Sequence, residues 1–395
     1  MKKAALFLLL TIASNLLPAQ QLLLSDEAQI SILTVAPGVQ LNDAFGHNAF
    51  RIKDDVNNLD IIFDYGRFDF NTPNFYLNFA RGKLNYSIGT SNFNRFLRVY
   101  AYQNRTIKEQ VLNVSQNQKQ KLYNFLIENN QPENRFYLYD FFFDNCATKM
   151  KDVLKIVLGN DISFEKPKDI KPQTFRTLIQ DHLNWNSWGS LGIDVALGSV
   201  IDTTPKTEDY MFLPENIYRF FEVATLNNNE PLIEDSSLIF VQKDRVHSSS
   251  FFVSPLFILG FISLIFTLIT FKDFKQRKRT KWLDVLLFSV TGIIGLCVLL
   301  LWFATDHSAT KHNYNLLWAC VLNIFIISQV FKNQANKWFI QYLKFLIILL
   351  CLLCLHWIIG VQVFAKGLLP VIILLFVRYL FLIQYFSRVK KNNTI

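Results

Sequence analysis

The chain has 395 residues, of which 51% are hydrophobic and 15% aromatic, and its formal net charge is +9. A basic balance of this size often indicates a nucleic-acid-binding protein, but the excess is confined to the C-terminal part of the chain. Residues 21–250 hold 23 Lys and Arg against 28 Asp and Glu, a net of −5, so the composition excludes nucleic acid as an expected partner.

The N-terminus is typical of a secretory signal peptide. Two lysines precede an apolar run, and small residues with a Pro-Ala-Gln break follow it. These features predict a signal peptide over residues 1–20, cut near Ala19 or Gln20, with an uncleaved anchor as the alternative. No cysteine stands at the cleavage point, so the mature chain is not expected to be a lipoprotein itself.

The composition changes after about residue 250. Each apolar run there has about the length that a bilayer requires, which predicts a five-helix transmembrane domain over residues 251–390. The loops on one side carry eleven Lys and Arg and those on the other side only two, which places the C-terminus in the cytoplasm. The chain is therefore expected to be a multi-pass membrane protein, with residues 21–250 exported to the outside of the cytoplasm. The predicted spans are 251–271, 282–303, 314–331, 343–363 and 368–386.

The exported domain mixes strand and helix patterns, which predicts an α+β fold. Period-two and β-rich runs alternate with segments of helical periodicity, and the chain from 184 to 205 is rich in turn residues. That turn-rich part and the segment 208–224 are interpreted as a lid or a membrane-facing surface. The expected strands are 29–35, 44–54, 60–70 and 135–143; the expected helices are 115–129, the segment from Asp144 or Asn145 to Gly159, and a helix beginning at Pro214.

Cys146 is the only cysteine of the exported domain, so no internal disulfide is possible there. It follows two good N-cap residues and lies in the first turn of the predicted helix. The unpaired N–H groups and the helix dipole at this position favour a thiolate, and the same amides can stabilise an oxyanion. The alternative is a buried apolar cysteine of purely structural use.

A nucleophilic thiol needs a base to take its proton. The exported domain has three histidines, and two of them, His182 and His247, stand in polar stretches. His47 follows Gly46 at the start of a strand, where the ring can point into a cleft. The sequence therefore favours His47 as the partner of Cys146.

Three motifs together resemble the exported domain of the Lnb-type bacterial lipoprotein N-acyltransferases. They are FGHNAFRI at 45–52, DYGRFDF at 64–70 and YDFFFDNCATK at 139–149. The order of His before Asn-Cys also resembles the circularly permuted papain-like (NlpC-like) fold of the lecithin:retinol acyltransferase relatives. The Lnb-type family also has a signal peptide before this domain and membrane helices after it, so the resemblance implies a protein of the bacterial inner membrane with this domain in the periplasm.

The resemblance implies a reaction and its participants. Cys146 would be the nucleophile and His47 the general base and acid, in a ping-pong cycle through a Cys thioester without a cofactor. The donor would be a membrane phospholipid and the acceptor the α-amine of a diacylglyceryl-cysteine lipoprotein. Oligomeric state and acyl-chain preference stay open.

Several further residues are candidates for supporting roles. Asp64 is expected to orient the imidazole, with Tyr65 or Arg51 as alternatives, and Asn145 either supports the oxyanion site or is an ordinary cap. His307 and His312, in the second outer loop of the membrane part, are secondary candidates for assisting the substrate. Two histidines five apart are weak evidence for a metal site, so no metal is predicted.

Two rival functions remain. The first is a Cys-dependent hydrolase, either a peptidase, an amidase or a lipid esterase, which differs from a transferase only in using water as the acceptor. The second is a non-catalytic assembly or sensor protein whose exported domain binds a partner. No Gly-x-Ser-x-Gly elbow, His-Glu-x-x-His or P-loop occurs, so a serine hydrolase, a zincin and an NTPase have no support.

Overall fold

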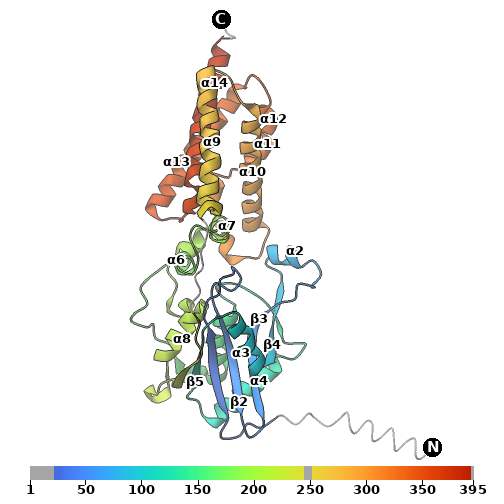
Figure 1. Cartoon of the computed structure of the whole chain (residues 1–395), viewed down its shortest axis with the longest axis vertical. Coiled ribbons are helices and arrows are strands. Elements are labelled where there is room, and N and C mark those ends of the chain that lie inside the picture. Colours follow the sequence, from blue (N-terminus) through green and yellow to red (C-terminus); the bar gives the residue numbers. More distant parts are fainter. Residues whose placement is uncertain (1–21, 244–250, 393–395) are drawn as a thin grey trace, which may run out of the picture.

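The structure, a computed structural model, describes residues 22–243 and 251–392. The predicted signal peptide, 1–20, lies outside the described residues. An α+β domain and a helical membrane domain follow one another along the long axis of the molecule (Figure 1). This arrangement confirms the predicted fold class at the level of an α+β domain followed by membrane helices.

The core of the first domain is a seven-stranded sheet in the order β6-β4-β3-β2-β1-β5-β9, with every neighbouring pair antiparallel. The central strand β2 carries the predicted His47, and its neighbour β3 carries the predicted Asp64. The bounds are β1 Gln29–Val35, β2 His47–Asp54, β3 Leu59–Arg67, β4 Asn85–Asn92, β5 Ile107–Leu112, β6 Phe136–Leu138 and β9 Ile233–Phe240; β7 Ile162–Ser163 and β8 Thr225–Leu226 form a separate pair.

Helices cover both faces of this sheet because successive residues of a strand point to opposite sides. Phe50 and Phe63 face the larger core, which includes residues of α4, α5 and α8, while Ala49 and Ile62 face a smaller core with residues of α3. The bounds are α2 Phe75–Ala80, α3 Phe93–Tyr102, α4 Gln116–Asn129, α5 Cys146–Leu158, α6 Phe175–Gln180, α7 Trp188–Ala196 and α8 Pro214–Val223.

Of the residues that the structure describes, four helices are long and apolar enough to cross a membrane. They correspond to the first, second, fourth and fifth predicted spans. Neighbouring helices are joined at alternating ends, and α14 ends at the pole farthest from the α+β domain (Figure 1). The bounds are α9 Pro255–Gln276, α10 Lys281–Phe303, α13 Lys337–Ile359 and α14 Leu369–Asn392.

The third predicted span, 314–331, is not one continuous helix. It contains a 3₁₀ turn, Tyr314–Leu317, and two short helices, α11 Leu322–Phe325 and α12 Ile327–Val330. Its backbone presses against α10, where a side chain on Gly295 would lie 2.1 Å from the carbonyl oxygen of Ala319. Asn323, buried in this segment, donates to Thr291 of α10 (2.8 Å) and accepts from the hydroxyl of Tyr342 (2.6 Å). Broken backbone is tolerated at membrane depth where protein surrounds it, and apolar length alone does not reveal such a break.

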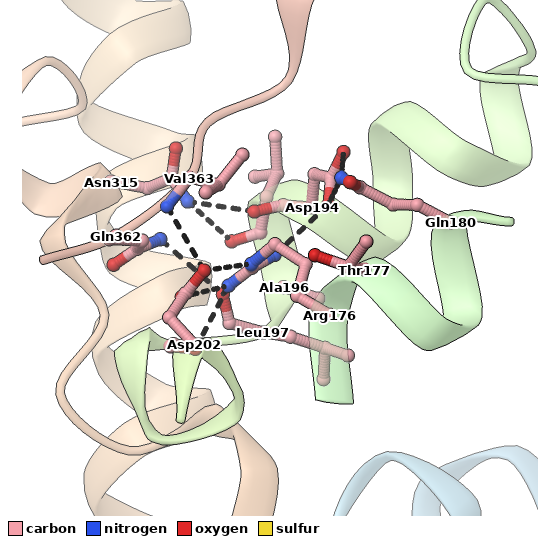
Figure 2. Close-up of polar contacts among 12 residues, drawn as sticks. Arg176, Thr177, Gln180, Asp194, Ala196, Leu197, Asp202, Asn315, Gln362 and Val363 are labelled. Atoms are coloured by element: carbon pink, nitrogen blue, oxygen red, sulfur yellow. Dashed lines mark hydrogen bonds and ion pairs between the residues drawn. The ribbon is translucent and has the colours of Figure 1, made fainter. Parts of the chain in front are cut away.

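A buried polar network joins the two domains, and Arg176 of α6 lies at its centre (Figure 2). The guanidinium is fully buried and donates to Asp194 (2.9 Å), to Asp202 (2.8 and 3.0 Å) and to the carbonyl oxygens of Leu197 and Gly198. All three guanidinium nitrogens are therefore satisfied, as a buried charge requires.

Residues of the membrane domain complete this joint. The backbone N–H of Val363 donates to Asp202 (3.1 Å), and the amide of Asn315 donates to the carbonyl oxygens of Asp194 and Val195 at the end of α7 (Figure 2). The last carbonyls of a helix have no partner within it, so the loops of the membrane domain that face the α+β domain cap α7. The joint therefore fixes the α+β domain against the membrane helices.

Candidate active site

Cys146 is the first residue of α5, and a capping box sets the start of this helix. The side-chain oxygen of Asn145 accepts from the N–H groups of Ala147 (2.8 Å) and Thr148 (2.9 Å), and Thr148 Oγ1 accepts from the N–H of Asn145 (2.8 Å). The amide nitrogen of Asn145 donates to the carbonyl oxygens of Phe141 and Phe212. Both of its N–H groups are thus occupied, so Asn145 positions Cys146 as a cap and has no donor left for an oxyanion.

His47 enters the site from the first position of β2, and the preceding glycine makes this entry possible. Gly46 has a φ of +89°, and a Cβ there would lie 2.7 Å from the carbonyl oxygen of Val35 and 3.2 Å from Pro214. A side chain at this position would be strained and would displace the chain that enters β2. The geometry of the chain therefore explains why a glycine precedes His47 in the first motif.

Asp64 is the residue that contacts the imidazole. It lies opposite Ala49 in the β2–β3 register, and its Oδ2 lies 3.4 Å from His47 Nε2. Arg67 Nε donates to its Oδ1 (2.6 Å). Burial alone would raise the pKa of Asp64, but His47 and Arg67 outweigh burial and lower it. Asp64 is therefore held as a carboxylate that can orient and stabilise a protonated His47.

The two alternatives to Asp64 are engaged elsewhere. Arg51 donates to Asp60 (2.8 Å) and Glu109 (3.1 Å) and packs over the ring of Phe93. Tyr65 lies in the larger core and its hydroxyl donates to Asn129. Neither residue contacts His47, so Asp64 is the one of the three candidates that the structure places beside the imidazole.

The pKa shifts of the two central groups favour an ion pair. Burial would raise the pKa of the Cys146 thiol, but the charge and hydrogen bond of His47 and the backbone N–H of Asn48 lower it. Burial would lower the pKa of His47, but Tyr100, Cys146 and Asp64 together raise it well above its ordinary value. A thiolate beside an imidazolium is the state in which a cysteine nucleophile is ready to attack.

Some parts of the site carried no clear signal in the sequence. The backbone N–H of Asn48 helps to lower the pKa of the Cys146 thiol, and a backbone donor has no residue signature. Arg67 and Tyr139 lie within two of the quoted motifs, but no pattern assigned them a role. Gly66 lies close to both Cys146 and Tyr139, since a Cβ there would be 3.8 Å from an atom of each. Tyr139 therefore belongs to the surroundings of Cys146.

The two secondary histidines lie in the loop that follows α10, and they contact different neighbours. His307 Nε2 lies 3.0 Å from the carbonyl oxygen of Phe79, while His312 packs against Trp302. Within residues 22–243 and 251–392, no group of three or more His, Cys, Asp or Glu is arranged to hold a metal ion. In the same loop Ser308 donates to Asp140, six residues before Cys146. The loop thus ties the membrane domain to the segment that leads into α5.

The pH dependence of Cys146 alkylation tests the ion pair. The thiolate forms as pH rises through the lowered pKa of Cys146, so reaction with iodoacetamide should reach half its maximal rate below the ordinary thiol value of about 8.5. In His47→Ala, burial acts without the compensating imidazolium, so the half-maximal pH should move above about 8.5. Mass spectrometry of the peptide that contains Cys146 measures the rate at each pH.

His312→Ala is the matched control for this experiment. The ring of His312 packs on Trp302, so its removal should leave the pH dependence of Cys146 alkylation unchanged. An unchanged curve in His47→Ala would contradict the ion pair.

These observations define a class: a membrane protein with a partly buried Cys-His-Asp constellation in an α+β domain joined to membrane helices. Comparison with protein families gives the family itself. The Lnb N-terminal periplasmic domain matches residues 20–181, and the Lnb transmembrane domain matches residues 246–391. The chain belongs to the Lnb family, which confirms the resemblance carried by the three motifs.

No curated protein and no solved structure matched the chain. The permuted papain-like assignment therefore stays a prediction. Family membership is consistent with an enzyme that modifies lipoproteins, and the chemistry itself is the subject of the proposal that follows.

Proposed function

We propose that the chain is a lipoprotein N-acyltransferase of the bacterial inner membrane that works through a thioester on Cys146. The observation that carries the proposal is the Cys146–His47–Asp64 constellation, built in the end of the α+β domain that contacts the outer loop of the membrane helices. A thiolate beside the bilayer surface can meet a lipid donor and a lipid-anchored acceptor without either leaving the membrane.

The first half-reaction transfers an acyl group to the enzyme. The thiolate of Cys146 attacks the ester carbonyl of a membrane phospholipid, the S–C bond forms, and the ester C–O bond breaks. The imidazolium of His47 donates its proton to the departing alcohol oxygen, which leaves as a lysophospholipid. Asp64 stabilises the imidazolium before this transfer and keeps the ring in place.

The second half-reaction returns the enzyme to its starting state. The free α-amine of a diacylglyceryl-cysteine lipoprotein attacks the thioester, the amide N–C bond forms and the S–C bond breaks. Neutral His47 takes the proton from the amine, which restores the thiolate–imidazolium pair. Conversion of an ester to an amide is downhill, so the proposed cycle needs neither ATP nor a cofactor.

The orientation in the membrane follows from the loop charges. Eleven Lys and Arg in the loops and tail on one side, against two on the other, support an orientation with the end of α14 in the cytoplasm and the Cys146 domain in the periplasm. Diacylglyceryl-modified lipoproteins with a free amine would then meet the site on the outer side.

The choice of acceptor separates this function from hydrolysis. The purified chain is placed in vesicles whose phospholipid has one labelled acyl chain, together with a synthetic diacylglyceryl-cysteine peptide. The label should move to the peptide as an amide, with one lysophospholipid released for each amide formed. The same peptide with an acetylated amine is the control and should stay unlabelled. Release of free fatty acid at equal rates with both peptides, without amide, would instead favour the hydrolase.

A further inference from the structure

An exposed aromatic segment stands out from the α+β domain beside the membrane helices. Residues 68–83 connect β3 to β4 and contain α2, and they are called here the aromatic arm (Figure 1). Phe70 is 66% exposed and Tyr76 is 78% exposed, and Leu77 and Phe79 are also exposed. Soluble surfaces rarely gather large apolar side chains in this way, so the arm is expected to have a partner.

Hydrogen bonds hold the arm at the level where a membrane helix ends. The N–H of Asp306 donates to the carbonyl oxygen of Arg81 (2.9 Å), and His307 Nε2 lies 3.0 Å from that of Phe79. Asp306 is only three residues beyond Phe303, the last residue of α10, which stacks on Trp302 and is itself exposed. In Figure 1 the light-blue α2 lies beside that end of α10.

The position of the aromatic arm at the end of α10 indicates that its partner is the lipid bilayer. Aromatic side chains are enriched at membrane–water interfaces, where an apolar ring meets lipid chains and a polar edge meets the headgroups. The exposed guanidinium of Arg81 adds positive charge at the level of the lipid phosphates. The outer leaflet around α10 is therefore the surface that fits the arm.

A line of aromatic rings connects the arm to the site. The ring centroids of Phe70 and Phe68 lie 5.0 Å apart, those of Phe68 and Tyr86 lie 5.4 Å apart, and Tyr86 stacks on Tyr139 at 4.4 Å. Tyr139 in turn lies beside Gly66, which is also close to Cys146. A row of contacting aromatic rings thus runs from the exposed tip of the arm to the neighbourhood of Cys146.

We propose that the aromatic arm contacts the acyl chains of the outer leaflet and that the rings from Phe70 to Tyr139 guide an acyl ester of a membrane lipid to Cys146. The proposal rests on the proposed function for its last step, the delivery to the thiol. Contact between the arm and lipid does not depend on that step and can be measured separately.

Photocrosslinking measures the contact. The photoreactive residue p-benzoylphenylalanine is placed at Tyr76 of the full chain in nanodiscs of phosphatidylethanolamine and phosphatidylglycerol. Illumination should add the mass of one phospholipid to the peptide that contains position 76. The control position is Val56, exposed in the β2–β3 turn at the opposite end of β2 from His47, where no lipid adduct is expected. No lipid adduct at position 76, or an adduct with protein alone, overturns the proposal whether or not the chain transfers acyl groups.

Substitution of exposed residues of the aromatic arm tests whether the arm delivers lipid to Cys146. Tyr76→Ser with Leu77→Ser removes two apolar anchors, and the rate of Cys146 acylation from vesicle phospholipid should fall by about tenfold or more. Alkylation of Cys146 by water-soluble iodoacetamide should keep its wild-type rate, which shows that the site is intact. The control, Val56→Ser with Ile156→Ser, changes two exposed apolar residues away from the arm and should leave acylation unchanged. Wild-type acylation in the arm variant would overturn the delivery path, whereas no acylation in the wild type would count against the proposed function instead.

Discussion

Cys146→Ala is expected to abolish acyl transfer, with a loss of about 10⁴-fold or more, because no other group in the site can carry the acyl chain. The hydroxylamine-labile acyl label that the wild type should accumulate without acceptor should also disappear. Cys146→Ser should be nearly as inactive, since an unactivated hydroxyl is a far weaker nucleophile than a thiolate.

The fold should survive this change. Alanine is a good helix former, and the cap of α5 is made by Asn145 and Thr148, which both remain. Cys297→Ala in α10 is the matched control, because that thiol lies in a membrane helix away from the site and should be dispensable. A folded Cys146→Ala protein that still forms the acyl label would contradict the mechanism.

Arg176→Ala is expected to lower the free energy of unfolding by about 3–5 kcal/mol, the cost of leaving buried charges without their partner. Asp194 and Asp202 both bind this guanidinium, and burial raises the pKa of each carboxyl even with Arg176 present. Without the arginine, both carboxylates would be buried and unpaired. Thermal unfolding of the full chain in nanodiscs, followed by circular dichroism, measures the loss.

Two comparisons make the Arg176 result specific. Arg219→Ala breaks an exposed pair with Asp169 and should change stability little, because solvent screens such pairs. In a background of Asp194→Asn and Asp202→Asn, Arg176→Ala should cost clearly less, since no charge is then left unpaired. A cost for Arg176→Ala no larger than that for Arg219→Ala would show that the joint is not a buried ion network in solution.

The place of Cys146 in the fold was predictable because its signal is local. An N-cap residue before an apolar periodic run predicts a helix start, and this places Cys146 at the beginning of α5 from the sequence alone. His47 and Asp64 were found as polar residues in strand patterns. Their contact, however, depends on the β2–β3 register, which pairs Ala49 with Asp64 and which no short stretch of sequence encodes.

The parts that sequence reasoning missed depend on contacts between distant segments. Arg176 looks like an ordinary helical arginine until Asp194 and Asp202 are folded around it. The predicted span at 314–331 is apolar enough for a helix, but its break depends on the close approach of Ala319 to Gly295 of α10. The aromatic arm was not predicted from the sequence for a similar reason, since its exposure and its place beside α10 are set only by the folded chain.

The most direct test of the account is mass spectrometry of the N-terminal peptide of an abundant lipoprotein. Cells that lack the chain are compared with cells that carry the wild type or Cys146→Ala at equal expression. The account predicts an N-acyl chain on the lipoprotein only in cells with the wild type. An N-acyl chain of the same abundance in all three strains would contradict it, and the Cys146 site would then have to serve another reaction or a binding role.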